Sequence, residues 1–351
     1  MASPAPEQHV RFNVLRDGHA RRSALYEATR QSLQGEVKAL PPTWLYDARG
    51  SRMYEEVTRL PEYYLPHRER DILHAHARAI AERTPASTLV ELGPGSATNT
   101  RLLLDALDAA GTLERFVALD VSEDALRASA HTIAEVYPRL SVDAFVGDFE
   151  RDLGLLPHGG RRLIAFLGST IGNLYPAQRA TLLGAVADAL GPDDGFLLGI
   201  DLVKDVRRLE AAYNDSRGVT EAFVRNALAA VNDELAASFD QARFVYEPRW
   251  DPDHEWMAIE LRARGAHAVR IDGLEIDVAF EQDEPLRVEI SAKFRSEEFV
   301  REVEQSGLRV ESLWTDHLGD FAVALMVADA PPQANVTTKR EENDVRRSKH
   351  L

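Results

Sequence analysis

Cysteine is absent from the 351 residues, which excludes disulfides, thiolate metal ligands and a cysteine nucleophile. Long apolar runs are also missing, since none approaches the roughly 18 residues that a transmembrane helix needs. Basic residues are outnumbered by acidic ones, and the net charge of −16 disfavours binding to nucleic acid or to an anionic membrane. We therefore expect small molecules as partners.

Signals for export and for metal binding are lacking too. The opening residues MASPAPEQHV contain no basic region followed by an apolar one, so we expect a cytosolic protein. No H-E-x-x-H or similar ligand spacing occurs, and we predict no metal site. Residues 1–13 and 330–351 are polar and aperiodic, and we expect both to be disordered because they offer little apolar surface to offset the entropy of ordering.

The middle of the chain alternates between short apolar runs and helical patterns, which predicts a parallel, doubly wound α/β sheet. Near the end, a helical stretch at 296–307 precedes two more strand-like runs, 308–316 and 321–329. Their link is too short for a crossover, so these two strands form an antiparallel hairpin. The five earlier strand-like runs are 88–93, 115–121, 141–149, 162–169 and 195–202.

A sheet of this kind, closed by a hairpin, is typical of the Rossmann-like class I methyltransferases rather than of the dehydrogenases. We assign residues 68–202 and 294–329 to that domain. Residues 14–67 and 203–293 remain outside the sheet, and we predict that they form a second, discontinuous α+β domain for substrate binding. This domain would cover the carboxyl edge of the sheet, where ligands of open α/β sheets bind.

Three features follow successive predicted strands. The turn GPGSATNT begins at Gly93 and opens a helix, although Thr98 stands where a dinucleotide fingerprint needs its third glycine. Asp120 ends the second strand, and Asp148 with Phe149 follows the third. Separately, these residues could be a tight turn, a turn aspartate and a helix cap. Together they favour a nucleoside site, with Asp120 at the ribose and the Asp148–Phe149 pair at the adenine.

Longer motifs resemble the histidine-specific N-methyltransferases of ergothioneine biosynthesis. The resemblance extends from about residue 14 to 328 and includes both predicted domains. Its segments are LPPTWLYDARGSRMYEEVTRLPEYYLPHRE (40–69), ELGPGSATNTRLLLDAL (91–107), FLGSTIGNLYP (166–176), DLVKDVRRLEAAYNDSRGVT (201–220) and VEISAKF (288–294).

The resemblance implies a monomeric enzyme that moves three methyl groups from S-adenosylmethionine to the amino group of L-histidine, which yields hercynine. It implies that the cofactor contacts lie at Gly93, Asn99, Asp120, Asp148 and Phe149. In the substrate site it implies catalytic roles for Tyr46 and Asn173, a carboxylate contact by Asn173 and Tyr213, an amino-group side formed by Tyr46, Tyr63 and Gly168, and imidazole contacts by Glu289 and Ser291.

Two residues depart from the family pattern. Asn99 replaces a lysine that some relatives carry in the cofactor loop, so one charged contact to the cofactor would be missing or replaced. Ile259 stands where relatives can have methionine beside the imidazole, and we expect it to line the substrate site. Without the resemblance, the tyrosines could be packing residues, Asn173 a helix cap, and the Glu289–Ser291 pair an exposed strand face.

Three other functions remain open. The first is an N-methyltransferase for another amino acid or an indole amine such as tryptophan, which the Glu289–Ser291 pair disfavours because an indole has only one N–H. The second is a nicotinamide dehydrogenase, which the missing third glycine and the terminal hairpin disfavour. The third is a methyltransferase-like binding protein without turnover, supported only by Asn99 and Ile259.

Overall fold

The structure of the chain is a computed structural model that describes residues 10–329. The expected disorder of residues 1–9 and 330–351 falls outside the described residues. Within residues 10–329, no helix is long and apolar enough to cross a bilayer.

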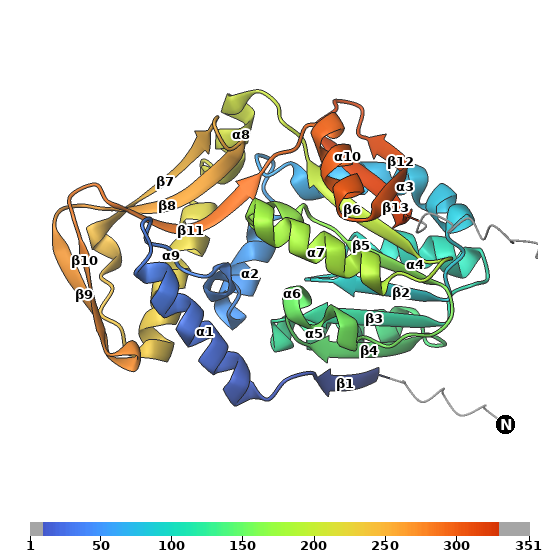
Figure 1. Cartoon of the computed structure of the whole chain (residues 1–351), viewed down its shortest axis with the longest axis horizontal. Coiled ribbons are helices and arrows are strands. Elements are labelled where there is room, and N and C mark those ends of the chain that lie inside the picture. Colours follow the sequence, from blue (N-terminus) through green and yellow to red (C-terminus); the bar gives the residue numbers. More distant parts are fainter. Residues whose placement is uncertain (1–9, 330–351) are drawn as a thin grey trace, which may run out of the picture.

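One eight-stranded sheet forms the larger part of the molecule (Figure 1), in the order β1-β4-β3-β2-β5-β6-β13-β12. Strands β1 to β6 of this sheet pair in parallel, whereas β13 pairs antiparallel with β6 and with β12. The predicted doubly wound sheet with a terminal hairpin is therefore confirmed. The strands are β1 (Val10–Val14), β2 (Thr88–Leu92), β3 (Arg115–Asp120), β4 (Ser141–Val146), β5 (Arg162–Phe166), β6 (Gly195–Asp201), β12 (Leu308–Thr315) and β13 (Phe321–Ala328).

Helices cover both faces of this sheet because β2 to β6 are apolar on both sides. Alternate strand residues belong to two separate cores, with Leu89 on one side and Val90 on the other. The first core is closed by α3 (Leu65–Arg83), α4 (Thr100–Ala109) and α5 (Glu123–Val136), and the second by α6 (Phe149–Asp152), α7 (Pro176–Ala189) and α10 (Ser296–Gln305).

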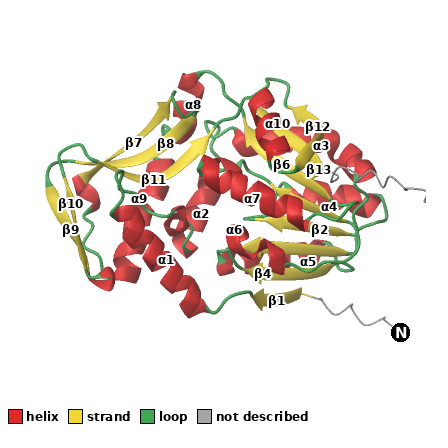
Figure 2. Ribbon diagram, viewed as in Figure 1, coloured by secondary structure: helices red, strands yellow, loops and turns green. Residues whose placement is uncertain are grey.

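A smaller unit lies beside the large sheet (Figures 1 and 2). It contains a three-stranded antiparallel sheet in the order β11-β8-β7 and a separate β9-β10 hairpin. Its strands are β7 (Phe244–Asp251), β8 (Trp256–Ala263), β9 (His267–Ile271), β10 (Ile276–Phe280) and β11 (Pro285–Ala292). Its helices are α1 (Gly18–Leu33), α2 (Ala48–Val57), α8 (Val206–Tyr213) and α9 (Val219–Leu235).

The chain leaves and re-enters the large sheet at one point, the carboxyl end of β6. The N–H of Phe294 donates to the carbonyl of Asp201, and the N–H of Val203 donates to the carbonyl of Phe294. The segment between these residues forms most of the smaller unit. Its last strand, β11, therefore ends directly beside the edge of the large sheet where the ligand site is expected.

The expectation that residues 1–13 are disordered is wrong for residues 10–13, which belong to β1. This strand pairs in parallel with β4, with Val10 opposite Val142. Arg11 donates to buried Asp143 over 2.6 Å, and Arg115 binds the same carboxylate from β3. The segment lacks a long apolar run because an edge strand needs only one buried face, so sequence pattern alone did not separate it from a loop.

Candidate active site

The cofactor residues predicted from the sequence lie at one edge of the large sheet. Gly93 follows β2, Asp120 ends β3 and Asp148 follows β4, and these three strands are neighbours. Gly93 and Gly95 have φ values of +68° and +51°, a conformation that favours glycine. A Cβ at either position would meet no protein atom within 4 Å, so the loop presents open backbone at this edge.

The two aspartates also make the local hydrogen bonds of a turn residue and of a helix cap, which were the alternative interpretations of Asp120 and Asp148. Asp120 accepts a hydrogen bond from the Ser122 N–H at 2.9 Å, and Asp148 caps α6 by accepting from the Glu150 N–H at 3.0 Å. Burial raises the pKa of both carboxyls, against these backbone hydrogen bonds. Both side chains remain partly exposed, so they are accessible to a ligand as well.

Phe149 begins α6 and packs against Phe166, with ring centroids 4.9 Å apart. Phe166 is the last residue of β5 and is fully buried, whereas Phe149 is partly exposed. One side of the Phe149 ring therefore packs against the core, while the rest of the ring remains exposed at the sheet edge. This is a suitable position for stacking on a nucleobase.

Asn99 contacts a carboxylate that sequence reasoning missed. Its amide donates to Glu69 Oε2 at 2.9 Å and to the Pro66 carbonyl at 3.3 Å. Glu69 lies on α3, and its other oxygen accepts the Gly168 N–H at 2.7 Å. Burial raises the pKa of Glu69 to about 7, against the hydrogen bonds from Asn99 and Gly168. Glu69 thus ties the cofactor loop to the loop that contains Gly168.

Three tyrosines predicted for the substrate site, Tyr46, Tyr63 and Tyr213, lie in one aromatic cluster with Tyr54. The centroid of Tyr54 lies 5.6 Å from that of Tyr46 and 6.4 Å from that of Tyr63, both edge to face. Tyr63 contacts Tyr213 in the same way at 5.9 Å, and Phe223 of α9 packs on Tyr46 at 5.8 Å. The structure therefore brings Tyr46, Tyr63 and Tyr213 together and adds Tyr54 and Phe223.

Tyr46 is influenced by charges from both the substrate residues and the cofactor residues. Its pKa is raised well above the usual value by burial, and then by the charges of Glu289 and Asp120 among others. The phenol therefore stays protonated and can donate a hydrogen bond. Nearby, the Ser51 and Ser122 hydroxyls lie 3.3 Å apart and join α2 to the turn after β3. The smaller unit thus contacts the cofactor edge directly.

Glu289 and Asn173 contact each other across the two units. The Asn173 amide donates to Glu289 Oε1 at 3.0 Å, while the cap of α7 is formed by Tyr175. Burial raises the pKa of Glu289 to about 8, against the positive charge of Lys293 and a hydrogen bond from Tyr46. Asn173 is therefore not a helix cap.

Ile259 lies opposite Glu289 in the antiparallel pairing of β8 with β11, so both side chains emerge on the same face. Ile259 is fully buried, whereas Glu289 remains partly exposed. The residue that departs from the family pattern therefore lies next to the carboxylate expected to contact the imidazole.

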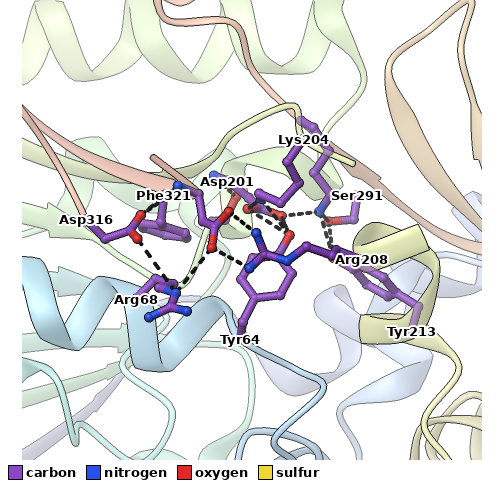
Figure 3. A network of polar contacts seen from close by, with 12 residues as sticks. Tyr64, Arg68, Asp201, Lys204, Arg208, Tyr213, Ser291, Asp316 and Phe321 are labelled. Carbon is purple, nitrogen blue, oxygen red and sulfur yellow. Dashed lines mark hydrogen bonds and ion pairs between the residues drawn. The ribbon is translucent and has the colours of Figure 1, made fainter. Parts of the chain in front are cut away.

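Ser291 and Tyr213 lie in a buried polar network (Figure 3). The Tyr213 hydroxyl donates to Ser291 Oγ at 2.7 Å, and Lys293 Nζ donates to both hydroxyl oxygens at 2.8 Å. Lys293 also binds Asp201 at 2.9 Å, and both of these side chains are completely buried. Sequence reasoning missed Lys293 and Asp201, although both lie within quoted segments, 288–294 and 201–220.

A parallel sheet closed by an antiparallel hairpin, with acidic residues at successive strand ends, is the architecture of the class I methyltransferases. A model of the family described as "histidine-specific methyltransferase, SAM-dependent" matches residues 25–328. The chain therefore belongs to this family of enzymes, whose methyl donor is S-adenosylmethionine.

Individual relatives agree with this assignment. The chain is 48% identical over 304 residues to the histidine N-alpha-methyltransferase of Mycolicibacterium smegmatis, covering 87% of this chain and 95% of the relative. It is 45% identical over 302 residues to the enzyme of that name from Mycobacterium tuberculosis, covering 86% and 94%. It is also 26% identical over 345 residues to the 4-dimethylallyltryptophan N-methyltransferase of Claviceps fusiformis, covering 90% and 93%.

Proposed function

We propose that this enzyme transfers three methyl groups in succession to the α-amino nitrogen of L-histidine, and that the product is the trimethylated betaine hercynine. The observation that carries the proposal is the pair Glu289 and Ser291, which share one face of β11 and meet Asn173 and Tyr213 there. The names and identities of the two mycobacterial relatives support the same substrate.

The residues at the sheet edge fit the methyl donor. We assign the Gly93 loop to the amino-acid portion of S-adenosylmethionine, Asp120 to its ribose, and Asp148 with Phe149 to its adenine. The open backbone at Gly93 and the accessible carboxylate of Asp120 support this fit. Bound there, S-adenosylmethionine supplies a methyl group on a sulfonium, which is already a good leaving group. Positioning of the amine then accounts for most of the rate.

The acceptor site would recognise each part of histidine separately. Glu289 accepts a hydrogen bond from an imidazole N–H, and Ser291 contacts the other ring nitrogen. Asn173 lies next to Glu289 and would hold the carboxylate with its free amide N–H. The implied contact of Tyr213 with the carboxylate is not proposed, because its only hydroxyl hydrogen is donated to Ser291. A ligand without the imidazole N–H leaves the Glu289 carboxylate unpaired, which costs roughly 1–3 kcal/mol or more.

The amino group must be neutral when it attacks, because a protonated amine has no lone pair. Proton loss to water is the proposed route, helped by the positive charge of the nearby sulfonium. Tyr46 would orient the amine by a hydrogen bond, and its raised pKa keeps this phenol a donor or acceptor rather than an anion. The rings of Tyr46, Tyr54 and Tyr63 would attract the cationic product by cation–π contacts.

We also infer that the enzyme acts as a monomer in the cytosol. The candidate cofactor and substrate residues of one chain lie together at one edge of the large sheet, which supports a site formed within a single copy. Sedimentation of the pure protein at micromolar concentration tests this inference, and a stable dimer would contradict it.

Mass spectrometry of products tests the proposed function. The enzyme is incubated with S-adenosylmethionine and, separately, with L-histidine, L-tryptophan and 4-dimethylallyltryptophan. We expect histidine to gain one, two and three methyl groups and the indole substrates to gain none. Methylation of an indole amine without methylation of histidine would favour the activity named for the Claviceps relative. Cofactor binding without any product would reduce the protein to a binding module.

A further inference from the structure

We infer that Lys293 is a positioning residue that fixes the Ser291 hydroxyl as a hydrogen-bond donor toward the substrate ring, so that the site selects a ring with one N–H and one bare nitrogen. This inference rests on the proposed function for the identity of the ligand. It assigns a role to a buried lysine that lies two residues beyond Ser291 at the end of β11.

The hydrogen bonds of Lys293 are fully used within the protein. An ammonium group has three N–H donors and no acceptor. Those of Lys293 go to Asp201 at 2.9 Å, to the Tyr213 hydroxyl at 2.8 Å and to Ser291 Oγ at 2.8 Å. Burial alone would lower the pKa of Lys293, but Asp201 and Tyr213 outweigh burial and raise it, so the group stays charged. Lys293 therefore has no donor left for a substrate and acts only through its neighbours.

The hydrogen of the Ser291 hydroxyl is the one hydrogen-bonding atom of this side chain without a partner within residues 10–329. Its oxygen accepts one hydrogen bond from Lys293 and another from the Tyr213 hydroxyl, which occupies both lone pairs. Its own hydrogen is accepted by no group within residues 10–329. The hydroxyl is therefore free to donate to a ligand. Without Lys293, the serine could rotate and accept a hydrogen bond instead.

The strand thus presents one acceptor and one donor. In its ionised form Glu289 only accepts, Ser291 donates, and residues i and i+2 of a strand lie on the same face. Neutral imidazole matches this pair, because it has one N–H and one nitrogen lone pair. A pyrrole or indole ring has the N–H but lacks the bare nitrogen, and imidazolium has two N–H groups. Each mismatch leaves the Ser291 hydrogen without an acceptor.

Lys204 provides a matched control. It binds the same carboxylate, Asp201, and is nearly as buried, with 6% of its side chain exposed. Its other partner is the Tyr64 hydroxyl at 2.7 Å rather than Ser291 or Tyr213. Figure 3 shows Lys204 and Tyr64 around Asp201, with Ser291 and Tyr213 farther along the network. Removing either lysine takes one cation from Asp201, but only Lys293 contacts the proposed donor.

The test is a double-mutant cycle read by titration calorimetry with L-histidine. We expect Lys293→Met and Ser291→Ala each to weaken histidine binding by roughly 10-fold or more. The serine variant removes the hydrogen bond to the ligand, and the lysine variant frees the serine to turn away from it. The double variant should bind about as weakly as Ser291→Ala alone, because the lysine acts through the serine. Lys204→Met should stay within about 3-fold of the wild-type affinity. Additive losses, or an equal loss in Lys204→Met, would overturn the inference.

A ligand series keeps the test valid even where Lys293→Met does not fold. The probe is an alanine that bears a pyrrole ring, which has the N–H of imidazole but no bare nitrogen. Wild-type enzyme should bind it roughly 10-fold or more weaker than histidine, and Ser291→Ala should remove most of that preference. Equal preference in both proteins refutes the donor role of Ser291. If wild-type enzyme binds no histidine at all, the proposed function fails instead.

Discussion

Replacing Glu69 by glutamine should flatten the dependence of stability on pH. This buried carboxyl has its pKa raised from 4.5 to about 7, chiefly by desolvation. The folded protein therefore binds a proton more tightly than the unfolded chain does, so the stabilising contribution is complete below about pH 4.5. It is lost as the pH rises through 7. Because one pKa unit corresponds to about 1.36 kcal/mol, the loss from Glu69 is about 3 kcal/mol.

The assay is urea unfolding at several pH values from 5 to 8, without ligands. Glutamine keeps an oxygen for the Gly168 N–H but cannot ionise, so Glu69→Gln should lose about 3 kcal/mol less than wild type across this range. Its amide faces the Asn99 amide, which adds a cost that does not vary with pH. Glu289, whose pKa is raised to about 8 by burial, contributes its own slope equally to both proteins. The pKa of Glu91 is raised to about 8 by burial and also by the charge of Glu69, so Glu69→Gln should reduce the slope from Glu91 as well.

Glu82→Gln is the matched control. Glu82 lies on the same helix, α3, but 60% of its side chain is exposed, in contact with Arg78. Its replacement should leave the pH dependence of unfolding unchanged. The reasoning is refuted if the wild-type and Glu69→Gln curves run parallel between pH 5 and 8, because Glu69 would then ionise alike in the folded and unfolded states.

Other predictions concern packing, cofactor binding and a buried ion pair. In Gly199→Ala, the new Cβ would lie 2.1 Å from Glu69 Oε1, so thermal unfolding should show a loss of about 1–3 kcal/mol. Asp120→Asn should weaken S-adenosylmethionine binding roughly 10-fold by calorimetry, because the amide loses the charge and one acceptor site for the ribose. Arg162→Met leaves the buried Asp194, now 2.6 Å from Arg162, without its cation and should cost about 3–5 kcal/mol in urea unfolding. An unchanged unfolding midpoint would contradict the predictions for Gly199→Ala and Arg162→Met. An unchanged affinity for S-adenosylmethionine would contradict the prediction for Asp120→Asn.

The sheet could be predicted from the sequence because its signals are local. Each central strand is a short apolar run bounded by turn residues, and the link between β12 and β13 is too short for any pairing but an antiparallel one. β1 carried no such signal, because its pairing with β4 depends on a partner far along the chain.

The buried charges could not be predicted in the same way. Glu69 lies in a helix with charged neighbours, and Lys293 lies at a strand end, so each pattern is typical of a solvated residue. Their burial depends on Asn99 and Gly168 in one case and on Asp201 in the other, all distant in sequence. The contact of Asn173 with Glu289 likewise needs both units in place, and the roles of the site residues toward ligands stay predictions.

Strand β1 belongs to the folded sheet but precedes the residues that the family model matches. The matched range begins at residue 25, so a chain trimmed to it would lack β1, the edge strand that covers β4. β4 would then present a row of unpaired backbone groups, and Asp143 would lose Arg11. An exposed edge of this kind recruits strands from other chains. Protein engineers who shorten this enzyme at the family boundary should therefore expect aggregation on expression even though every candidate ligand contact is retained.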